Sequence, residues 1–385
     1  MINYPLAADT WNEAEYDAIN RVIKSNRFTI GSEVELFEKE FADFFGSEHA
    51  VMVNSGSSAN LIAIAALILS DKYDLNQGDE VIVPAVSWAT TYTVLHQYGL
   101  KLRFIDIDKD TFNLNLDDLK NAITDNTKAV FAVNLLGNPN DFDRLIKICD
   151  ENNLILLEDN CESMGATYNG KYTGTFGVLG TFSTFYSHHM ATMEGGMILT
   201  DDAELNDIMK SIRSHGWTRN LNKDSKFYTE NDEFYEMFNF IFPGYNVRPV
   251  EMEAALGREQ LKKLKTFLKY RKENGKCYKK LFSQIDNISI QKNQDDSSYF
   301  GFPIIFESEN ERKEFIEKCD AENIEYRPIV AGNFTKNKVI EYFDYTIYGD
   351  LKNANNLHDN GLFIGNHHFD IKDKLKQIYE LLKEE

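Results

Sequence analysis

The sequence predicts an α/β protein in which a large domain holds a mostly parallel central sheet and a smaller α+β domain follows at the C-terminal end. Over the first 240 residues, short apolar runs alternate with helical patterns. Such alternation is typical of parallel βαβ units covered by helices on both faces. The composition becomes polar and charged after Asn220, and a second, shorter set of strand and helix patterns begins at Tyr299.

The elements of the first unit follow from apolar runs of strand length and from helical periodicity. Strands are predicted at 49–53, 80–85, 102–106, 129–133, 154–158 and 197–200, and helices at 59–69, 90–98, 116–122 and 142–151. Because ligands of such sheets bind at the carboxyl ends of the strands, the polar residues that follow these runs are the candidate site residues.

The second unit is shorter, and its elements are less regular. Residues 222–239 read as an exposed excursion, and a long helix rich in Lys and Leu is predicted at 251–278. Further strands are predicted at 299–306 and 324–328, and further helices at 310–322 and 373–382. We therefore predict two domains, 1–250 and 251–385.

Composition excludes several classes of protein. The chain has 385 residues, 43% hydrophobic and 26% charged, as in an ordinary soluble globular protein rather than a disordered or fibrous one. Its formal net charge of −20 argues against nucleic acid and against an acidic membrane as partners. The longest apolar run, 61–69, is too short to span a membrane, and residues 1–16 lack the apolar core of a signal peptide. We expect a cytoplasmic protein.

The four cysteines form no metal motif. They are Cys149, Cys161, Cys277 and Cys319, and no two are spaced as a CxxC pair. This spacing does not fit zinc, so we expect reduced thiols, mostly in the core, and no metal.

Two candidate segments follow predicted strands. In Asn-Ser-Gly-Ser-Ser-Ala at 54–59, Gly56 permits a tight turn, and hydroxyl and amide groups at the start of the helix suit a phosphate. An ordinary serine N-cap is the alternative. In Glu-Asp-Asn-Cys-Glu-Ser at 158–163, Asp159 would hold a proton on a heterocyclic nitrogen, as pyridoxal phosphate (PLP) enzymes require, or would simply cap a helix.

Two further segments are less specific alone. Residues 181–196 are rich in hydroxyl and aromatic side chains and contain His188 and His189 before a Gly-Gly pair. Structural histidines are the alternative there. In residues 243–255 a glycine turn leads to Arg248 and a helix, which is also what a plain helix start with an acidic first turn looks like.

Together, the order and spacing of the four segments resemble the DegT/DnrJ/EryC1/StrS family of PLP-dependent nucleotide-sugar enzymes, which have the fold type I aminotransferase architecture. The resemblance runs from Asn-Arg-Phe-Thr-Ile-Gly at 26–31 to Gly-Tyr-Asn-Val-Arg at 244–248. It implies that domain 1–250 binds PLP or its aminated form, pyridoxamine phosphate (PMP), and that domain 251–385 is the small C-terminal domain.

The resemblance implies a set of cofactor-binding residues. The positions that form the phosphate cradle in the family are occupied here by Gly56, Ser57 and Ser183. Trp88 stands at the position of the aromatic ring that stacks on the pyridine, although a core tryptophan is the alternative. Asp159 takes the place of the partner of the pyridine nitrogen.

Two further positions complete that set. Glu162 stands where many relatives carry Gln or His near the cofactor's 3-hydroxyl, and Asn246 where a residue reaches the phosphate in a neighbouring subunit. The latter implies a homodimer with shared active sites.

One position departs from the family's aminotransferases. Six residues before Glu194, where they carry the lysine that binds PLP covalently, this chain has His188, and no lysine lies between Lys171 and Lys210. The cofactor must then be held non-covalently. An imidazole with a pKa of ~6.5 can take a proton as a base and return it to a leaving oxygen as an acid. His188 is therefore the predicted catalytic residue, and the expected product is a 3-deoxy sugar.

This exchange resembles the sugar 3-dehydratases of the family, of which there are two kinds. One acts on a CDP-sugar with an iron–sulfur centre and a reductase, which the dispersed cysteines do not fit. The other acts on GDP-4-keto-6-deoxymannose in the route to colitose, uses L-glutamate to regenerate PMP and releases ammonia. The stretch Ser-His-His-Met-Ala-Thr-Met-Glu-Gly-Gly at 187–196 favours the second kind. A 4-aminotransferase that makes GDP-perosamine and a non-catalytic cofactor-binding homologue are the alternatives.

The resemblance also implies residues that face the substrate: Asn26, Arg27, Phe28, Thr29, Ser187, His215, Arg219 and Arg248. We assign Arg219 to the sugar nucleotide or glutamate and His215 to the glutamate carboxylate, because an arginine fork suits a diphosphate or a carboxylate. Ordinary surface ion pairs are the alternative for each cation.

Overall fold

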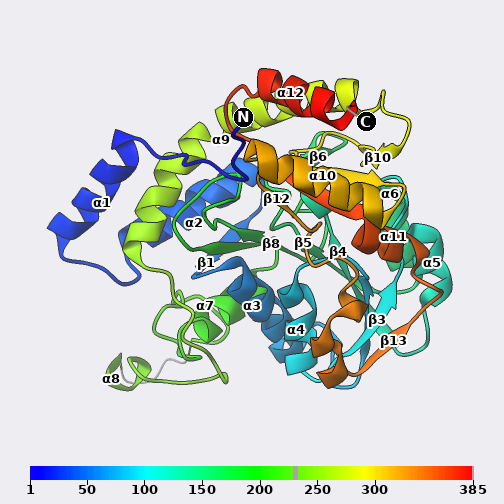
Figure 1. Cartoon of the computed structure of the whole chain (residues 1–385). Helices are drawn as coiled ribbons and strands as arrows, with labels where there is room; N and C mark the ends of the chain where they lie inside the picture. The colour runs from blue at the N-terminus through cyan, green and yellow to red at the C-terminus, as the bar shows by residue number, and fades with distance from the viewer. Residues whose placement is uncertain (229–232, 384–385) are drawn as a thin grey trace.

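The predicted mostly parallel sheet is confirmed in the computed structural model, which describes residues 1–228 and 233–383 (Figure 1). Eight strands pair in the order β1-β9-β8-β5-β4-β2-β3-β13, and β9 runs antiparallel to both its neighbours while the other pairs are parallel. The strands are β1 (His49–Val53), β2 (Glu80–Pro84), β3 (Lys101–Ile105), β4 (Thr127–Val133), β5 (Ile155–Asp159), β8 (Leu179–Ser183), β9 (Gly196–Thr200) and β13 (Tyr345–Ile347).

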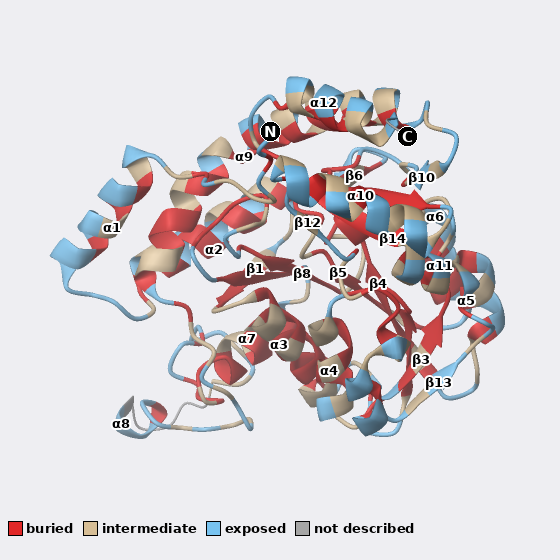
Figure 2. Ribbon diagram, in the orientation of Figure 1, coloured by how far each residue is buried: buried red, intermediate tan, exposed pale blue. Residues whose placement is uncertain are grey.

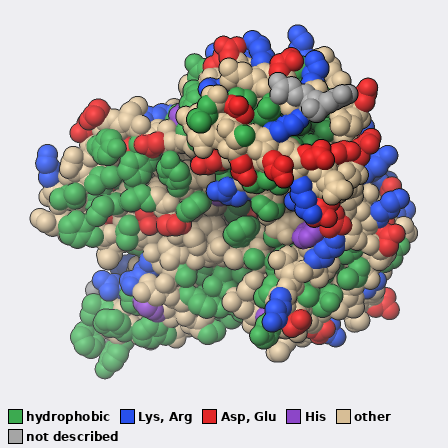
Figure 3. Space-filling view, in the orientation of Figure 1, with side chains coloured by type: hydrophobic (Ala, Val, Ile, Leu, Met, Phe, Trp, Pro, Cys, Tyr) green, Lys and Arg blue, Asp and Glu red, His purple; other side chains and the backbone are tan. Residues whose placement is uncertain are grey.

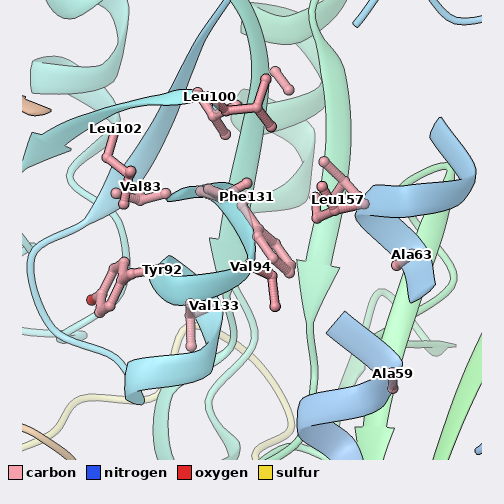
Figure 4. Close-up of a cluster of buried hydrophobic side chains, with 14 of the residues drawn as sticks. Ala59, Ala63, Val83, Tyr92, Val94, Leu100, Leu102, Phe131, Val133 and Leu157 are labelled. Atoms are coloured by element: carbon pink, nitrogen blue, oxygen red, sulfur yellow. The ribbon is translucent and has the colours of Figure 1, made fainter. Parts of the chain in front are cut away.

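Helices cover both faces of this sheet because its strands are apolar on both (Figure 2). One face packs against α3 (Gly56–Leu69), α4 (Ala89–Gln97) and α7 (Ala203–Ile212), and the other against α2 (Ser32–Phe45), α5 (Leu116–Ala122) and α6 (Phe142–Glu151). Along β4, Phe131 and Val133 join the core under α3 and α4, whereas Val130 and Ala132 join the core under α5 and α6. Figure 4 shows Phe131 among the side chains of the first core.

The C-terminal part forms a second layer around a long helix, α9 (Glu251–Phe282). Its antiparallel sheet has the order β10-β11-β14-β12 and comprises β10 (Ile288–Ile290), β11 (Gly301–Phe306), β14 (Gly361–Gly365) and β12 (Tyr326–Arg327). The helices here are α10 (Glu309–Glu322), α11 (Lys352–Asn360) and α12 (Lys372–Lys383). β13, from this part of the chain, pairs with β3 in the large sheet, and the boundary at 250 stays a prediction.

Several elements were not predicted from the sequence. They include α1 (Glu13–Ser25), α2, α7, α11, β8, β10, β13, β14, the hairpin of β6 (Thr167–Tyr168) and β7 (Lys171–Tyr172), and the short helices η1 (Leu135–Gly137), η2 (Phe334–Lys336) and η3 (Lys338–Tyr342). In the predicted excursion 222–239, α8 (Glu233–Glu236) is helical, and residues 229–232 lie outside the described part. Within the described part, every helix is too short or too polar to cross a bilayer.

A buried carboxylate joins α9 to the start of α2. Glu251, 3% exposed, accepts hydrogen bonds from the amides of Gly31 (2.8 Å), Glu33 (3.0 Å) and Val34 (3.0 Å). Gly31 is the N-cap of α2 and has no side chain to satisfy these amides itself. Glu251 therefore caps α2 from a position 220 residues away in the sequence.

Replacing Glu251 by alanine leaves these amides without partners. We expect Glu251→Ala to lower the free energy of unfolding by ~2–4 kcal/mol, as measured by urea denaturation. Glu273→Ala is the control, because that half-exposed carboxylate on the same helix makes only a 3.8 Å ion pair with Lys372. Equal effects of the two substitutions would contradict the cap.

Candidate active site

The predicted site residues of the large domain gather where β1, β5 and β8 end. Asp159, the last residue of β5, is 5% exposed. Its Oδ2 atom accepts hydrogen bonds from Asn60 Nδ2 (2.9 Å) and Thr91 Oγ1 (2.7 Å), and its Oδ1 atom accepts one from the amide of Cys161 (3.2 Å). The carboxylate is thus fixed in one orientation by α3, α4 and its own loop.

The preceding acid, Glu158, points to the opposite face of the sheet because strand side chains alternate. It is fully buried and accepts hydrogen bonds from the amides of Gly174 (2.7 Å), Phe176 (2.6 Å) and Gly177 (2.8 Å) and from Asn134 Nδ2 (3.2 Å). Burial raises the pKa of Glu158, although these donors favour the ionised form. The contacts tie the loop before β8 to β5.

Close backbone packing brings the start of α3 against β8 and β9. A Cβ atom on Gly56 would lie 2.6 Å from Ser183 Cβ, and one on Gly196 would lie 2.2 Å from the carbonyl oxygen of Ser55. Only glycine allows this approach. Ser57 is half-buried, and its Oγ atom donates to Thr90 Oγ1 (3.2 Å) at the start of α4. The structure therefore brings Gly56 against Ser183, with Ser57 next to Gly56 at the start of α3.

Two other predicted residues flank this group. Trp88, the N-cap of α4, is 59% exposed, so it is not a core tryptophan. Glu162 Oε2 accepts a hydrogen bond from the amide of Leu136 (3.0 Å), which lies in the left-handed region (φ 52°). Burial, reinforced by the nearby charge of Asp159, raises the pKa of Glu162 to about 7.

His188 and His189 lie against Phe300 from the C-terminal part of the chain. The His188 ring meets Phe300 edge to face with a centroid distance of 5.1 Å, and the His189 ring lies 5.8 Å from Phe300. Within residues 1–228 and 233–383, the buried Nδ1 atom of each histidine has no hydrogen-bond partner. Burial, assisted by the charge of Arg271, lowers the pKa of His188 to about 3, so its imidazole is neutral at pH 7.

The loop that carries His188 is closed on itself and anchored from outside. The amide of Thr184 donates to the carbonyl oxygen of Gly195 (2.9 Å), and the amide of Thr192 donates to that of Thr184 (2.9 Å). Ala191 is held from both sides, since its amide donates to Gln260 Oε1 (3.2 Å) and its carbonyl oxygen accepts from Trp11 Nε1 (3.0 Å). Ser187 is half-buried in this loop.

The predicted cations gather around Trp217. His215 meets its ring edge to face at 5.2 Å, and the guanidinium groups of Arg219 and Arg248 lie 5.5 and 5.8 Å from its centroid. Asn246 is exposed, and its Oδ1 atom accepts a hydrogen bond from Arg248 Nε (2.9 Å).

This group lies beside the start of α3, because the amide of Asn54 donates to the carbonyl oxygen of Val247 (3.1 Å). The structure therefore places the segment that carries Arg248 next to the start of α3, and the roles of these cations stay predictions.

The remaining predicted residues are exposed and lie at the start of α9. Asn26, Arg27, Phe28 and Thr29 link α1 to α2, and Thr29 forms a bridge with Val250. Arg27 Nη2 donates to the carbonyl oxygen of Ile30 (3.1 Å). Among the described hydrogen bonds and ring contacts, none joins this segment to Asp159 or His188 of the same chain.

Four residues of the site were not predicted from the sequence: Asn60, Thr91, Arg271 and Phe300. Asn60 carried a usable signal, because it is a buried polar side chain inside the apolar run of α3. The others carried none, since each contact depends on elements distant in the sequence.

This chain is similar to known proteins of one family along nearly its whole length. The model of the DegT/DnrJ/EryC1/StrS aminotransferase family matches residues 9–383. A GDP-4-keto-6-deoxy-D-mannose 3-dehydratase of Yersinia pseudotuberculosis is 54% identical over 388 residues, covering 100% of this chain and 99% of the relative.

Two solved structures share this fold closely. GDP-4-keto-6-deoxymannose-3-dehydratase with a trapped PLP-glutamate geminal diamine is 52% identical, with a TM-score of 0.97 over 99% of this chain and 100% of the other. A variant of an enzyme of that name, with a histidine replaced by asparagine and with GDP-perosamine bound, is 51% identical, with a TM-score of 0.96 over 99% of this chain and 100% of the other.

A methyl group at Gly56 tests the close packing of α3 on β8. We expect Gly56→Ala to lower the free energy of unfolding by ~1–3 kcal/mol, because the new Cβ atom overlaps Ser183. Adding Ser183→Gly removes the opposing Cβ atom and restores part of that loss. Urea denaturation of both single variants and the double variant measures the coupling, and Ser57→Ala, which adds no atoms, is the control. Purely additive effects would contradict the contact.

Proposed function

Because the chain belongs to the DegT/DnrJ/EryC1/StrS aminotransferase family, we propose that it is a PLP-dependent lyase that removes the 3-hydroxyl group of GDP-4-keto-6-deoxy-D-mannose. The observation that carries this proposal is His188, which stands where the family's aminotransferases have lysine, beside an otherwise complete set of predicted cofactor residues. The identity to the 3-dehydratase, which covers both chains almost completely, supports it.

The residues present fit the cofactor. Asp159 is held by three hydrogen bonds and would stabilise the protonated ring nitrogen. Gly56 leaves room for the start of α3 to approach β8, so Ser57, Ser183 and the amide groups of the helix would bind the phosphate. The exposed ring of Trp88 would cover the pyridine face.

Glu162 would complete that set at the cofactor's 3-hydroxyl. Because its pKa is raised to about 7, part of the population carries a proton at neutral pH and can donate it in a hydrogen bond to a phenolate oxygen.

When bound, the cofactor supplies an electron sink for the carbon atoms of the keto sugar. His188 moves the proton. Its Nδ1 atom is buried, so we assign the transfer to Nε2. Burial and Arg271 keep the imidazole neutral, and in the tautomer that carries its proton on Nδ1 the Nε2 atom would accept the proton lost from the methylene group of the aminated cofactor. The imidazolium would then give that proton to the leaving 3-hydroxyl oxygen, which departs as water.

The cations around Trp217 are proposed to bind the anionic ligands. We assign His215 to the carboxylate of L-glutamate, and Arg219 and Arg248 to the diphosphate or glutamate. The relatives solved with PLP-glutamate and with GDP-perosamine support glutamate and a GDP-sugar as the ligands. Ser187 and residues 26–29 are proposed to contact the sugar nucleotide. The free cysteines fit a reducing compartment, which favours the cytoplasm.

We propose a homodimer with shared sites. Large apolar side chains gather over the region of α8 and along α1 and α2 (Figure 3). Tyr235, Phe238 and Phe240 are 69%, 64% and 56% exposed, and Phe28 is 45% exposed, which is the kind of surface that protein partners cover. In such a dimer Asn246 would reach the partner's cofactor phosphate.

The dehydration is tested with protein, PMP, L-glutamate and GDP-4-keto-6-deoxymannose. We expect a GDP-linked 3-deoxy sugar, 2-oxoglutarate and ammonia, identified by mass spectrometry and enzymatic assays. The His188→Asn variant should bind PMP but dehydrate ~10²–10⁴-fold more slowly, because it cannot transfer the proton. A CDP-linked keto sugar run in parallel tests the nucleotide. Formation of an amino sugar in place of a 3-deoxy sugar would refute the proposal.

Shared sites predict complementation between two defective subunits. Each hybrid dimer of His188→Asn and Asn246→Ala subunits contains one site with both defects and one site with none. Random co-assembly should therefore restore about a quarter of the wild-type activity, since half of the dimers are hybrids with one intact site. Tagged co-expressed proteins and light scattering measure composition and mass. If Asn246 acts in its own subunit's site, the mixture stays as weak as its components.

A further inference from the structure

A buried arginine, Arg271, is connected to the two histidines of the site through a short chain segment. Arg271 on α9 is 4% exposed, and its Nε atom has no hydrogen-bond partner among residues 1–228 and 233–383. Over the same described residues, no carboxylate lies within ion-pair distance of its guanidinium group. Burying a charge in this way is unfavourable unless other groups compensate for the lost water.

The compensation comes from the chain segment 298–300. Arg271 Nη1 donates to the carbonyl oxygens of Phe300 (3.2 Å) and Tyr299 (3.4 Å). Asn366 Nδ2 donates to the carbonyl oxygens of Tyr299 (2.8 Å) and Arg271 (3.1 Å). The segment is thus held by hydrogen bonds from α9 and from the residue after β14.

Close packing also fixes this segment. Tyr299 lies in the left-handed region (φ 49°), which is strained for a residue with a large side chain. A Cβ atom on Gly275 would lie 2.7 Å from the Tyr299 ring, and one on Gly137 would lie 2.5 Å from the Tyr299 amide nitrogen. Two glycines and two hydrogen-bond donors therefore surround the strained residue and restrict the conformation of the segment.

The same segment contacts both histidines. The Phe300 ring packs against His188, and the carbonyl oxygen of Ser298 lies 3.3 Å from His189 Nε2. The amide of Phe300 donates to the carbonyl oxygen of Leu136 (3.0 Å), whose own amide binds Glu162. Arg271 therefore touches neither histidine through these contacts, but it binds the segment that does.

We propose that Arg271 is a positioning residue for the dehydration, because it holds residues 298–300 so that the Phe300 ring orients the His188 imidazole. The fixed positive charge of Arg271 also disfavours protonation of that imidazole. The proposal rests on the proposed function, since it is His188 that transfers the proton there. It adds the orientation of His188 through Phe300 to the effect that the charge of Arg271 has on that imidazole.

The direction of the charge effect follows from the groups around Arg271. Its charge adds to burial in lowering the pKa of His188 to about 3 and those of His367 and His368 to about 4. The other titratable or charged groups of this region are His189, Lys272 and Tyr4, with Asp159 and Glu162 at the carboxyl end of β5. Removing the charge of Arg271 therefore raises the pKa of the histidines, and His188 gains protons at a higher pH.

The experiment uses Arg271→Met, which removes the charge, and Arg271→Lys, which keeps it. NMR titration of histidine-labelled protein without cofactor, with the His188 signal assigned through His188→Asn, measures proton affinity directly. We expect the affinity of His188 to rise about tenfold or more in Arg271→Met and to change less than about twofold in Arg271→Lys. Lys272→Met is the matched control, because that neighbouring cation pairs with Asp296 (2.6 Å) and should leave His188 unchanged.

The orienting role is tested separately with Phe300→Leu, which keeps Arg271 and removes the ring. We expect kcat for dehydration to fall about tenfold, with little change in KM for the GDP-sugar. An unchanged proton affinity in Arg271→Met, or an unchanged kcat in Phe300→Leu, overturns the proposal. If Arg271→Met does not fold, the kcat of Phe300→Leu alone decides whether the proposal stands.

The two proposals fail in different ways. If the wild-type protein does not dehydrate the GDP-sugar, the proposed function is lost, and the NMR titration still decides whether the charge of Arg271 controls the protonation of His188.

Discussion

Burial of two consecutive carboxylates at the end of β5 constrains everything around the site. A carboxylate leaves water only where hydrogen bonds replace it, and strand alternation sends Glu158 and Asp159 to opposite faces of the sheet. Glu158 binds the amides of the loop 174–177. Asp159 binds Asn60 of α3 and Thr91 of α4. The end of one strand therefore holds the loop before β8, the two helices that begin at the site and the sheet. The proposed cofactor would meet a preorganised surface there.

The chemistry of the site could be predicted from the sequence where it depends on residue type at a strand end. Gly56 and Asp159 come at the ends of predicted apolar runs, so the rule that ligands bind at the carboxyl ends of parallel strands locates them. Ser183 and His188 follow β8, which was not predicted, and only the resemblance to the family pointed to them. The residues that orient them could not be predicted. Arg271 acts on His188 through a carbonyl hydrogen bond and a ring contact, and nothing in the local sequence of α9 distinguishes this arginine from an exposed one.

The same limit applies to the fold. The buried strands and the apolar helix α3 are visible as runs, because burial on both faces requires continuous hydrophobicity. α2 begins at a glycine without a side-chain cap, since Glu251 of a distant helix supplies the acceptor. The three residues of β13 form a strand because β3 lies beside them, so their pairing depends on the tertiary structure rather than on the local sequence.

That late strand has a consequence for how the chain is made. β3 is complete at Ile105, yet its outer edge pairs with β13, which ends at Ile347 of a chain of 385 residues. During synthesis from the N-terminus, the backbone amide and carbonyl groups along that edge stay open while most of the polypeptide emerges, and an open edge is a template for pairing with other chains. A ribosome that stalls before β13 has emerged therefore leaves β3 without its outer neighbour in the sheet.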